Sequence, residues 1–364
     1  MMHSEYKHGG DIFGAVRSTG GSIDQIHDFS ANINPLGPSP AALQAINNSL
    51  HLIRHYPDPR CSELRRALAG YLGVPPENML PGNGASELIY LLARVLGCRR
   101  VAVPSPTFIE YAEAVTAAGG SVRVVPLDEE KAFALPAVAL KKELGQSDAV
   151  FICNPNNPTG RVEKRAVIQS IVEYAARENK TVVVDEAFMD FVAHAGQCTV
   201  LPLVEKHPHL VVLYSLTKFF GIPGLRLGML IGSVPLIKKL EAGKDPWSVN
   251  TLAQAAGTAA LNDKEYMEET RRLVAREREF LFRAVSLIPG LTAFHGEANY
   301  LLIKIESDGI NSPRLAVETA RRGVLVRDCS NFGGLGDRYV RVAVRSRREN
   351  VVLLDVLKGI MGGV

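Results

Sequence analysis

Residues 210–228 read LVVLYSLTKFFGIPGLRLG. The stretch begins as an apolar, β-branched run of the kind that forms a strand buried on both faces of a sheet. It continues into Ser215, Thr217 and Lys218, and Arg226 follows. Burial lowers the pKa of a lysine and makes its amine a nucleophile that can form a Schiff base. The two hydroxyls and the guanidinium beside it predict a site for an anion.

Upstream of this stretch, apolar runs alternate with helical patterns. The runs are RRVAVPSP (99–106), SVRVVPL (121–127), AVFICNP (149–155) and TVVVDEAF (181–188), and apolar residues at helical spacing fill 85–96. Such alternation predicts an α/β fold in which helices sandwich a mostly parallel central sheet. We expect this large domain to span residues 36–250.

The C-terminal third of the chain has a different pattern. A long charged helix, expected at about 263–287, precedes ANYLLIKI (298–305), a helix near 312–322, GVLVRDC (323–329) and RYVRVAVR (338–345). These elements predict a smaller α+β domain over residues 251–364. The turn-rich residues 1–35 are expected to pack against that small domain.

Composition and charge exclude several classes of protein for this sequence. Hydrophobic residues make up 46% and charged residues 22% of the 364, which is typical of a folded globular protein and excludes a disordered chain. The 41 basic and 38 acidic residues leave a net charge of +3, and the basic residues are scattered, so we expect no nucleic-acid partner. No apolar run reaches the ~18 residues that span a membrane, and the N-terminus lacks the apolar core of a signal peptide. Five cysteines, odd in number and far apart, favour the cytoplasm.

Three further polar segments mark candidate ligand contacts: PGNGASE (81–87), NPNNPTG (154–160) and VDEAF (184–188). The glycines let an anion approach the free amides of the helix at 85–96, although in isolation a plain helix N-cap is the better interpretation. The asparagine loop follows a strand, where open α/β sheets bind ligands, and is otherwise a structural turn. Asp185 needs a cationic partner if it is buried, and is otherwise a strand-end acid in solvent. His51 and His55 lack a third ligand, so we expect no metal site.

The order of these motifs along the chain is more specific than any one of them. NG-A-SE, NPNNPTG, DEAF and SLTK with a downstream arginine resemble the fold-type I pyridoxal-phosphate enzymes of the class I/II aminotransferase superfamily. The resemblance covers essentially the whole chain and implies pyridoxal 5'-phosphate as the cofactor. Within the superfamily, the sequence is most similar to the threonine-phosphate decarboxylases of cobalamin biosynthesis and to the histidinol-phosphate aminotransferases.

The resemblance implies a role for residues of each motif. Lys218 resembles the lysine that forms the Schiff base, and Asp185 resembles the carboxylate that keeps the pyridine nitrogen protonated; these are the implied catalytic residues. Phe108, in PSPTFIEY, resembles the aromatic that stacks on the ring. Tyr56, in RHYPDP, resembles the tyrosine lent by the neighbouring subunit, which implies a homodimer. The other implied cofactor contacts are Asn157 at the ring hydroxyl oxygen and, around the phosphate, Gly84, Ala85, Ser86, Ser215, Thr217 and Arg226.

The resemblance also implies how a phosphorylated amino acid would bind. Arg341 matches the arginine that clamps the substrate α-carboxylate. HGGD (8–11) and DFSANINPLG (28–37) resemble the decarboxylases, and Phe188 stands where the related aminotransferases usually carry a tyrosine. The segment DCSNFGGL departs from the decarboxylase pattern before its cysteine and at Phe332, which leaves details of the substrate open. The implied substrate contacts are His8, Gly9, Asn32, Asn157, Arg327 and Arg341.

Three functions from different classes remain. The leading one is pyridoxal-phosphate-dependent decarboxylation of L-threonine O-3-phosphate to 1-amino-2-propanol O-2-phosphate and carbon dioxide. The alternative is an aminotransferase acting on histidinol phosphate or an aromatic amino acid. A regulator with an aminotransferase-like domain is disfavoured, because no helix-turn-helix pattern precedes the domain.

Overall fold

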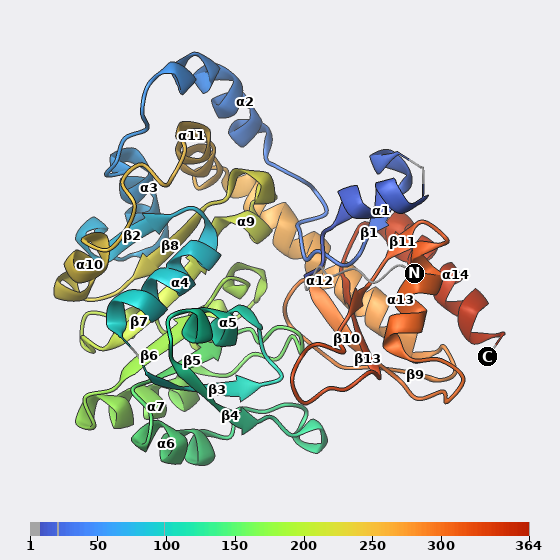
Figure 1. The fold of residues 1–364 in the computed structure, drawn as a ribbon. Coiled ribbons are helices and arrows are strands. Elements are labelled where there is room, and N and C mark those ends of the chain that lie inside the picture. Colours follow the sequence, from blue (N-terminus) through green and yellow to red (C-terminus); the bar gives the residue numbers. More distant parts are fainter. Residues whose placement is uncertain (1–7, 20–21, 98, 364) are drawn as a thin grey trace.

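A seven-stranded sheet forms the centre of the computed structural model, which describes residues 8–19, 22–97 and 99–363 (Figure 1). Its strand order is β2-β8-β7-β6-β5-β3-β4. Strand β8 runs antiparallel to both of its neighbours, and every other neighbouring pair is parallel. The predicted mostly parallel α/β sheet is therefore confirmed. The strands are β2 (Met79–Gly82), β3 (Arg100–Ser105), β4 (Ser121–Pro126), β5 (Ala149–Cys153), β6 (Thr181–Asp185), β7 (Leu210–Ser215) and β8 (Gly228–Ile231).

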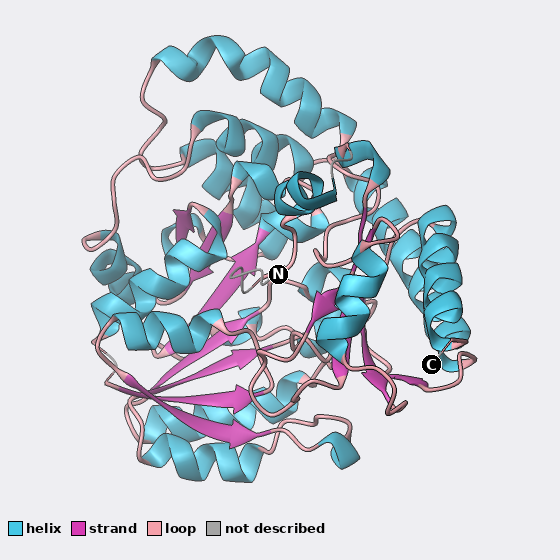
Figure 2. Ribbon diagram, turned by 45° about the vertical axis from the view of Figure 1, so that its right-hand side comes forward, coloured by secondary structure: helices cyan, strands magenta, loops and turns pink. Residues whose placement is uncertain are grey.

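Helices cover both faces of this sheet (Figure 2). Successive strand residues point to opposite faces, so Val182 and Val184 belong to one apolar core and Val183 to the other. This two-sided burial explains why the strands appear in the sequence as continuous apolar runs. On the Val183 face lie α4 (Gly84–Leu96), α5 (Glu110–Ala117) and α10 (Val234–Glu241); on the other lie α3 (Ser62–Leu72), α6 (Ala137–Gly145), α7 (Arg165–Arg177) and α11 (Thr251–Ala260).

A second, four-stranded antiparallel sheet has the order β12-β13-β10-β9. The long helix α12 (Lys264–Ser286) contributes Val274 to the core of the large sheet and Leu281 to the core of this smaller sheet, so it joins the two. The strands are β9 (Leu291–Ala293), β10 (Tyr300–Ile305), β12 (Arg327–Asp328) and β13 (Tyr339–Ala343), and the remaining helices are α1 (Ile12–Thr19), α2 (Pro40–Ser49), α8 (Ala195–Cys198), α9 (Leu216–Phe219), α13 (Ser312–Ala320) and α14 (Arg347–Met361).

The N-terminal segment adds a short parallel strand pair, β1 (His27–Asp28) with β11 (Val324–Leu325). The apolar run at 323–329 is not a single strand. It divides at Val326 into β11 and β12, which belong to different sheets. The boundaries of the domains at 36–250 and 251–364 stay predictions.

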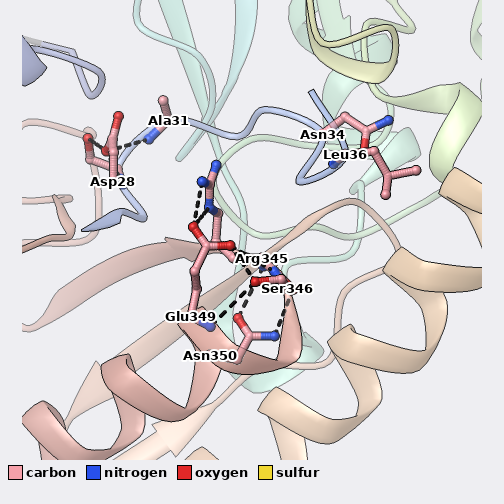
Figure 3. A network of polar contacts seen from close by, with 9 residues as sticks. Asp28, Ala31, Asn34, Leu36, Arg345, Ser346, Glu349 and Asn350 are labelled. Atoms are coloured by element: carbon pink, nitrogen blue, oxygen red, sulfur yellow. Dashed lines mark hydrogen bonds and ion pairs between the residues drawn. The ribbon is translucent and has the colours of Figure 1, made fainter. Parts of the chain in front are cut away.

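Short polar contacts fix the loops on either side of the smaller sheet (Figure 3). In one loop, Asp28 Oδ1 accepts hydrogen bonds from the amides of Ser30 (2.8 Å) and Ala31 (3.3 Å). After β13, Arg345 donates to Glu349 at 2.6 Å, next to the capping box that starts α14. These contacts hold the backbone around Ser30, whose carbonyl contacts the site described below, and the backbone that follows β13. Across the described ranges, no helix combines the length and apolar character that a membrane crossing requires.

Candidate active site

Polar motifs lie together at the carboxyl ends of the central strands of the large sheet. The loop 154–160 follows β5, Asp185 ends β6, and Ser215 ends β7 just before the short helix α9. These three strands are parallel neighbours, so their carboxyl ends lie at the same edge. This is the edge at which open α/β sheets bind their ligands.

Lys218 lies on α9, which Ser215 caps. The Ser215 Oγ accepts from the Thr217 amide at 3.3 Å, and the two hydroxyl oxygens are 2.8 Å apart. Burial, together with the charges of the nearby Arg226 and Arg341 guanidiniums, lowers the pKa of Lys218 to about 8, and the charge of Asp185 opposes this only in part. A useful fraction of the amine is therefore unprotonated near neutral pH, as nucleophilic attack requires.

Asp185 is buried, with one donor on each carboxylate oxygen. The Tyr111 hydroxyl donates to Oδ2 at 2.6 Å, and the Ala187 amide donates to Oδ1 at 2.9 Å. Burial raises the pKa of Asp185, while these two hydrogen bonds and the charge of Lys218 lower it. Sequence reasoning missed Tyr111; the available signal was its position three residues after Phe108, on the face of α5 that meets the sheet.

A cradle for an anion forms where α4 begins. Gly84 has φ +83°, and a Cβ built there would lie 2.4 Å from the Arg226 guanidinium, so only glycine permits this approach. A Cβ on Gly228 would likewise lie 2.5 Å from the Ala85 amide nitrogen. Gly84, Ala85 and Ser86 form the first helical turn, whose amides lack intrahelical acceptors. Arg226 and the start of α4 together suit a phosphate group.

Two arginines are buried side by side in the smaller sheet. Arg327 on β12 is paired with Arg341 on β13, and their side chains are 8% and 6% exposed. Arg341 donates to the carboxamide oxygen of Asn157 and, at 2.7 Å, to the carbonyl of Ser30. Its Nε has no hydrogen-bond partner within the described ranges, and no carboxylate pairs with it there. Burial lowers the pKa of Arg341 to about 10, with Arg327 adding to the effect. Two like charges at paired positions repel each other, and an anion bound beside them would offset this repulsion.

The predicted phosphate contacts lie on the N-terminal segment. His8 Nε2 is 2.7 Å from the Glu110 carboxylate, and its ring centre is 6.1 Å from that of Phe108. A Cβ on Gly9 would lie 2.1 Å from the Ser30 carbonyl oxygen, so only glycine fits there. Asn32 is buried, and its Oδ1 has no partner in the part of the chain described. The structure thus brings His8 to the predicted ring-stacking residue, although its imidazole contacts a carboxylate.

Tyr56 is placed apart from these residues. It is 79% exposed, and its ring stacks on that of Trp247 with centres 4.6 Å apart. It lines a surface cavity of about 540 Å³ between α2, α3 and α11. Of the sequence-predicted site residues, it is the one that is largely exposed.

Comparisons with known proteins agree with this geometry. Residues 24–357 match the family described as aminotransferase class I and II. The threonine-phosphate decarboxylase of Salmonella typhimurium is 38% identical over 98% of this chain and 97% of its own. The histidinol-phosphate aminotransferase of Methanopyrus kandleri is 33% identical over 95% of this chain and 91% of its own.

A solved structure is similar over nearly the whole fold. The crystal structure of L-threonine-O-3-phosphate decarboxylase from Porphyromonas gingivalis covers 93% of this chain and 100% of that one, with a TM-score of 0.82 and 26% identity. The motif order, the sheet and the family match lead to one conclusion: the chain belongs to the class I and II aminotransferase family.

Proposed function

We propose that this chain is a pyridoxal-phosphate-dependent carboxy-lyase that converts L-threonine O-3-phosphate into 1-amino-2-propanol O-2-phosphate and carbon dioxide, a step of cobalamin biosynthesis. The observation that carries the proposal is the buried pair of arginines, Arg327 and Arg341, facing each other across two strands. Higher identity to a threonine-phosphate decarboxylase than to a histidinol-phosphate aminotransferase supports it.

The residues present fit pyridoxal phosphate. Lys218 would hold its aldehyde carbon, Asp185 its ring nitrogen, and the cradle of Gly84 and Arg226 its phosphate, with Phe108 against the ring and Asn157 at the ring hydroxyl. Gly84 leaves room for the Arg226 guanidinium, and the lowered pKa of Lys218 leaves part of its amine unprotonated near neutral pH. When bound, the cofactor supplies a sink for the electrons released at the substrate α-carbon.

The arginine pair matches a short substrate with two anionic ends. Residues directly opposite in an antiparallel pair have Cα atoms about 5 Å apart. The two arginines could therefore bind two neighbouring groups of one ligand. Arg341 would bind the α-carboxylate, and Arg327 would bind the phosphate together with His8, Gly9 and Asn32. Histidinol phosphate has no carboxylate and would leave Arg341 without its anion, although the amino-acid partner of an aminotransferase would not.

Orientation of the carboxylate then decides which bond breaks. By binding the carboxylate, Arg341 would fix its orientation and so help to select the bond at the α-carbon whose electrons the bound cofactor accepts. Lys218 would return a proton to the α-carbon. Phe188 packs edge-on against Tyr300, 5.0 Å between ring centres, and has no hydroxyl to donate to a ring oxygen.

The proposed assembly is a homodimer in the cytoplasm. Tyr56 would cross to the phosphate site of the neighbouring subunit, which accounts for its outward position. Among the described residues, Cys61, Cys153, Cys198 and Cys329 are free thiols, consistent with a reducing compartment; Cys98 lies outside the described part of the chain.

Product analysis tests the reaction. The purified enzyme is incubated with L-threonine O-3-phosphate labelled in the carboxyl carbon and, separately, with histidinol phosphate and 2-oxoglutarate. We expect one labelled carbon dioxide per substrate consumed in the first tube and no glutamate in the second. Rapid glutamate formation without carbon dioxide would assign the aminotransferase function instead.

A further inference from the structure

Tyr111 contacts both groups that the proposed function places around the cofactor ring. Its side chain is fully buried on α5, and its hydroxyl lies 2.6 Å from Asp185 Oδ2. Its ring meets Phe108 edge-on, with centres 5.6 Å apart, and stacks on Phe151 at 5.3 Å. Tyr111 therefore contacts both Asp185 and Phe108.

No other side chain donates to Asp185 within the described ranges. The remaining donor is the Ala187 amide, which the backbone fixes after β6. A buried carboxylate with few donors holds a proton more readily, so the charge of Asp185 depends on the Tyr111 hydroxyl. Burial also raises the pKa of Tyr111 well above its ordinary value, so this hydroxyl stays a donor across the working pH range.

We propose that Tyr111 is a positioning residue for the cofactor: its hydroxyl orients Asp185 and keeps it ionised, so that the carboxylate holds a proton on the ring nitrogen. This inference rests on the proposed function, because it requires pyridoxal phosphate beside Asp185. It extends that function by assigning a role to a residue to which the resemblance assigned none.

The physical reason is competition for one proton. The ring nitrogen and Asp185 share a proton, and its position depends on the relative basicity of the two groups. The Tyr111 hydrogen bond stabilises the carboxylate form and leaves the proton on nitrogen. Without it, the proton moves toward the carboxylate, and the neutral ring withdraws electrons from the α-carbon less strongly.

The test uses Tyr111→Phe, which removes the hydroxyl and retains the ring packing. The matched control is Tyr71→Phe, which removes a half-buried hydroxyl that donates to another carboxylate, Asp190, at 2.7 Å and does not contact Asp185. Each protein is loaded with pyridoxal phosphate labelled with nitrogen-15 in the ring, and the ring-nitrogen NMR shift is recorded with the cofactor dissociation constant and the thermal unfolding curve.

We expect the ring-nitrogen signal of Tyr111→Phe to move from the protonated toward the neutral pyridine position. We also expect the cofactor to bind about 10-fold more weakly, as is typical when a hydrogen bond to a charged group is lost. The Tyr71→Phe protein should keep the wild-type signal and affinity. In an Asp185→Asn background, Tyr111→Phe should have no further effect on affinity, because the partner of the hydroxyl has lost its charge.

Distinct results overturn the inference and the proposed function. If the wild-type protein does not bind pyridoxal phosphate, the proposed function fails. If it binds and Tyr111→Phe leaves the ring-nitrogen signal unchanged, or Tyr71→Phe moves it equally, the role of Tyr111 is refuted. Should Tyr111→Phe not fold, 3-fluorotyrosine at position 111 retains the packing and is a stronger donor. It should raise the pH at which the ring nitrogen loses its proton, and an unchanged or lower midpoint would refute the proposal.

Discussion

Individual buried charges define this site. Lys218, Arg226 and Arg341 lie close enough for the two guanidiniums to lower the pKa of the lysine, and Asp185 is the one carboxylate that opposes them. Arg341 is buried and Lys218 and Arg226 are half-buried, so holding this much positive charge partly out of water is costly, and the cost is offset when anionic groups bind. We therefore expect the site to favour a ligand that carries a phosphate and a carboxylate.

The pKa of Lys218 predicts how the apoenzyme captures its cofactor. Only the unprotonated amine attacks an aldehyde, so the capture rate should rise with pH through a midpoint near 8. An ordinary lysine would give a midpoint near ~10.4. Stopped-flow absorbance with pyridoxal phosphate measures the rate at each pH. The assignment of Lys218 fails if borohydride fixes the cofactor to another lysine, or if Lys218→Ala captures it at the wild-type rate.

The second prediction at this scale concerns Arg327. Replacing it with alanine should lower kcat/KM for L-threonine O-3-phosphate by ~30- to 1000-fold, since a charge-assisted contact with phosphate is lost. Turnover of unphosphorylated L-threonine should change much less. Arg338→Ala is the control, because Arg338 precedes β13 and pairs with the exposed Asp308 at 3.1 Å. Equal losses with both substrates would show that Arg327 does not bind the phosphate.

Sequence reasoning reached the residues whose side chains the resemblance assigns to the site and missed Tyr111, which ends the quoted PSPTFIEY segment without an assigned role. Lys218, Asp185 and Arg226 stand in strings whose order is specific to the family. Tyr111 is a tyrosine on an apolar helix face, a pattern that packing alone explains. Only the coordinates reveal that its hydroxyl reaches Asp185 across 74 positions of sequence.

At the scale of elements, the carboxyl ends of strands and the N-termini of helices position the site residues. The alternation of apolar runs and helices was sufficient to predict the parallel sheet. It could not predict that β8 is antiparallel, because strand direction depends on a connection rather than on composition. Nor could it divide 323–329 into two strands, since Val324 and Arg327 lie in one uninterrupted run and differ only in their distant partners, β1 and β13.

The start of α4 provides a prediction for an element. Gly84→Ala should push the Arg226 guanidinium aside and weaken cofactor binding by at least ~10-fold, because the new Cβ would overlap it and φ is positive. Gly119→Ala is the matched control: its φ is +79°, yet nothing lies within 4 Å of the new Cβ. Fluorescence titration of the apoenzymes measures both. Similar affinities for the two variants would remove Gly84 from the phosphate cradle.

At the scale of the whole molecule, the N-terminal segment ties the two sheets together. Asn34 Nδ2 donates to the Phe219 carbonyl at 2.7 Å beside Lys218, and also to the Thr270 hydroxyl on α12 at 2.7 Å. The loop before it carries Ser30, whose carbonyl accepts from Arg341. One short segment thus contacts both α9, which carries Lys218, and Arg341 on β13.

The outward position of Tyr56 predicts complementation between subunits. Tyr56→Ala and Lys218→Ala homodimers should each be nearly inactive. Mixed and re-associated, they should regain activity, because one site per heterodimer then has Lys218 from one subunit and Tyr56 from the other. Recovery approaching one quarter of the wild-type rate is expected when random mixing forms half the dimers. No recovery, with heterodimers verified by mass, would place Tyr56 in the site of its own subunit or in none.

The most direct measurement of the central claim is an NMR time course of the reaction in D₂O with L-threonine O-3-phosphate. Decarboxylation with protonation at the α-carbon predicts a product that keeps its amine and phosphate and carries one deuteron on the carbon that lost the carboxylate. The substrate signal should fall as this single product rises, with no oxo acid. Formation of the oxo acid in the presence of an amino acceptor, with the carboxylate retained, would contradict the account.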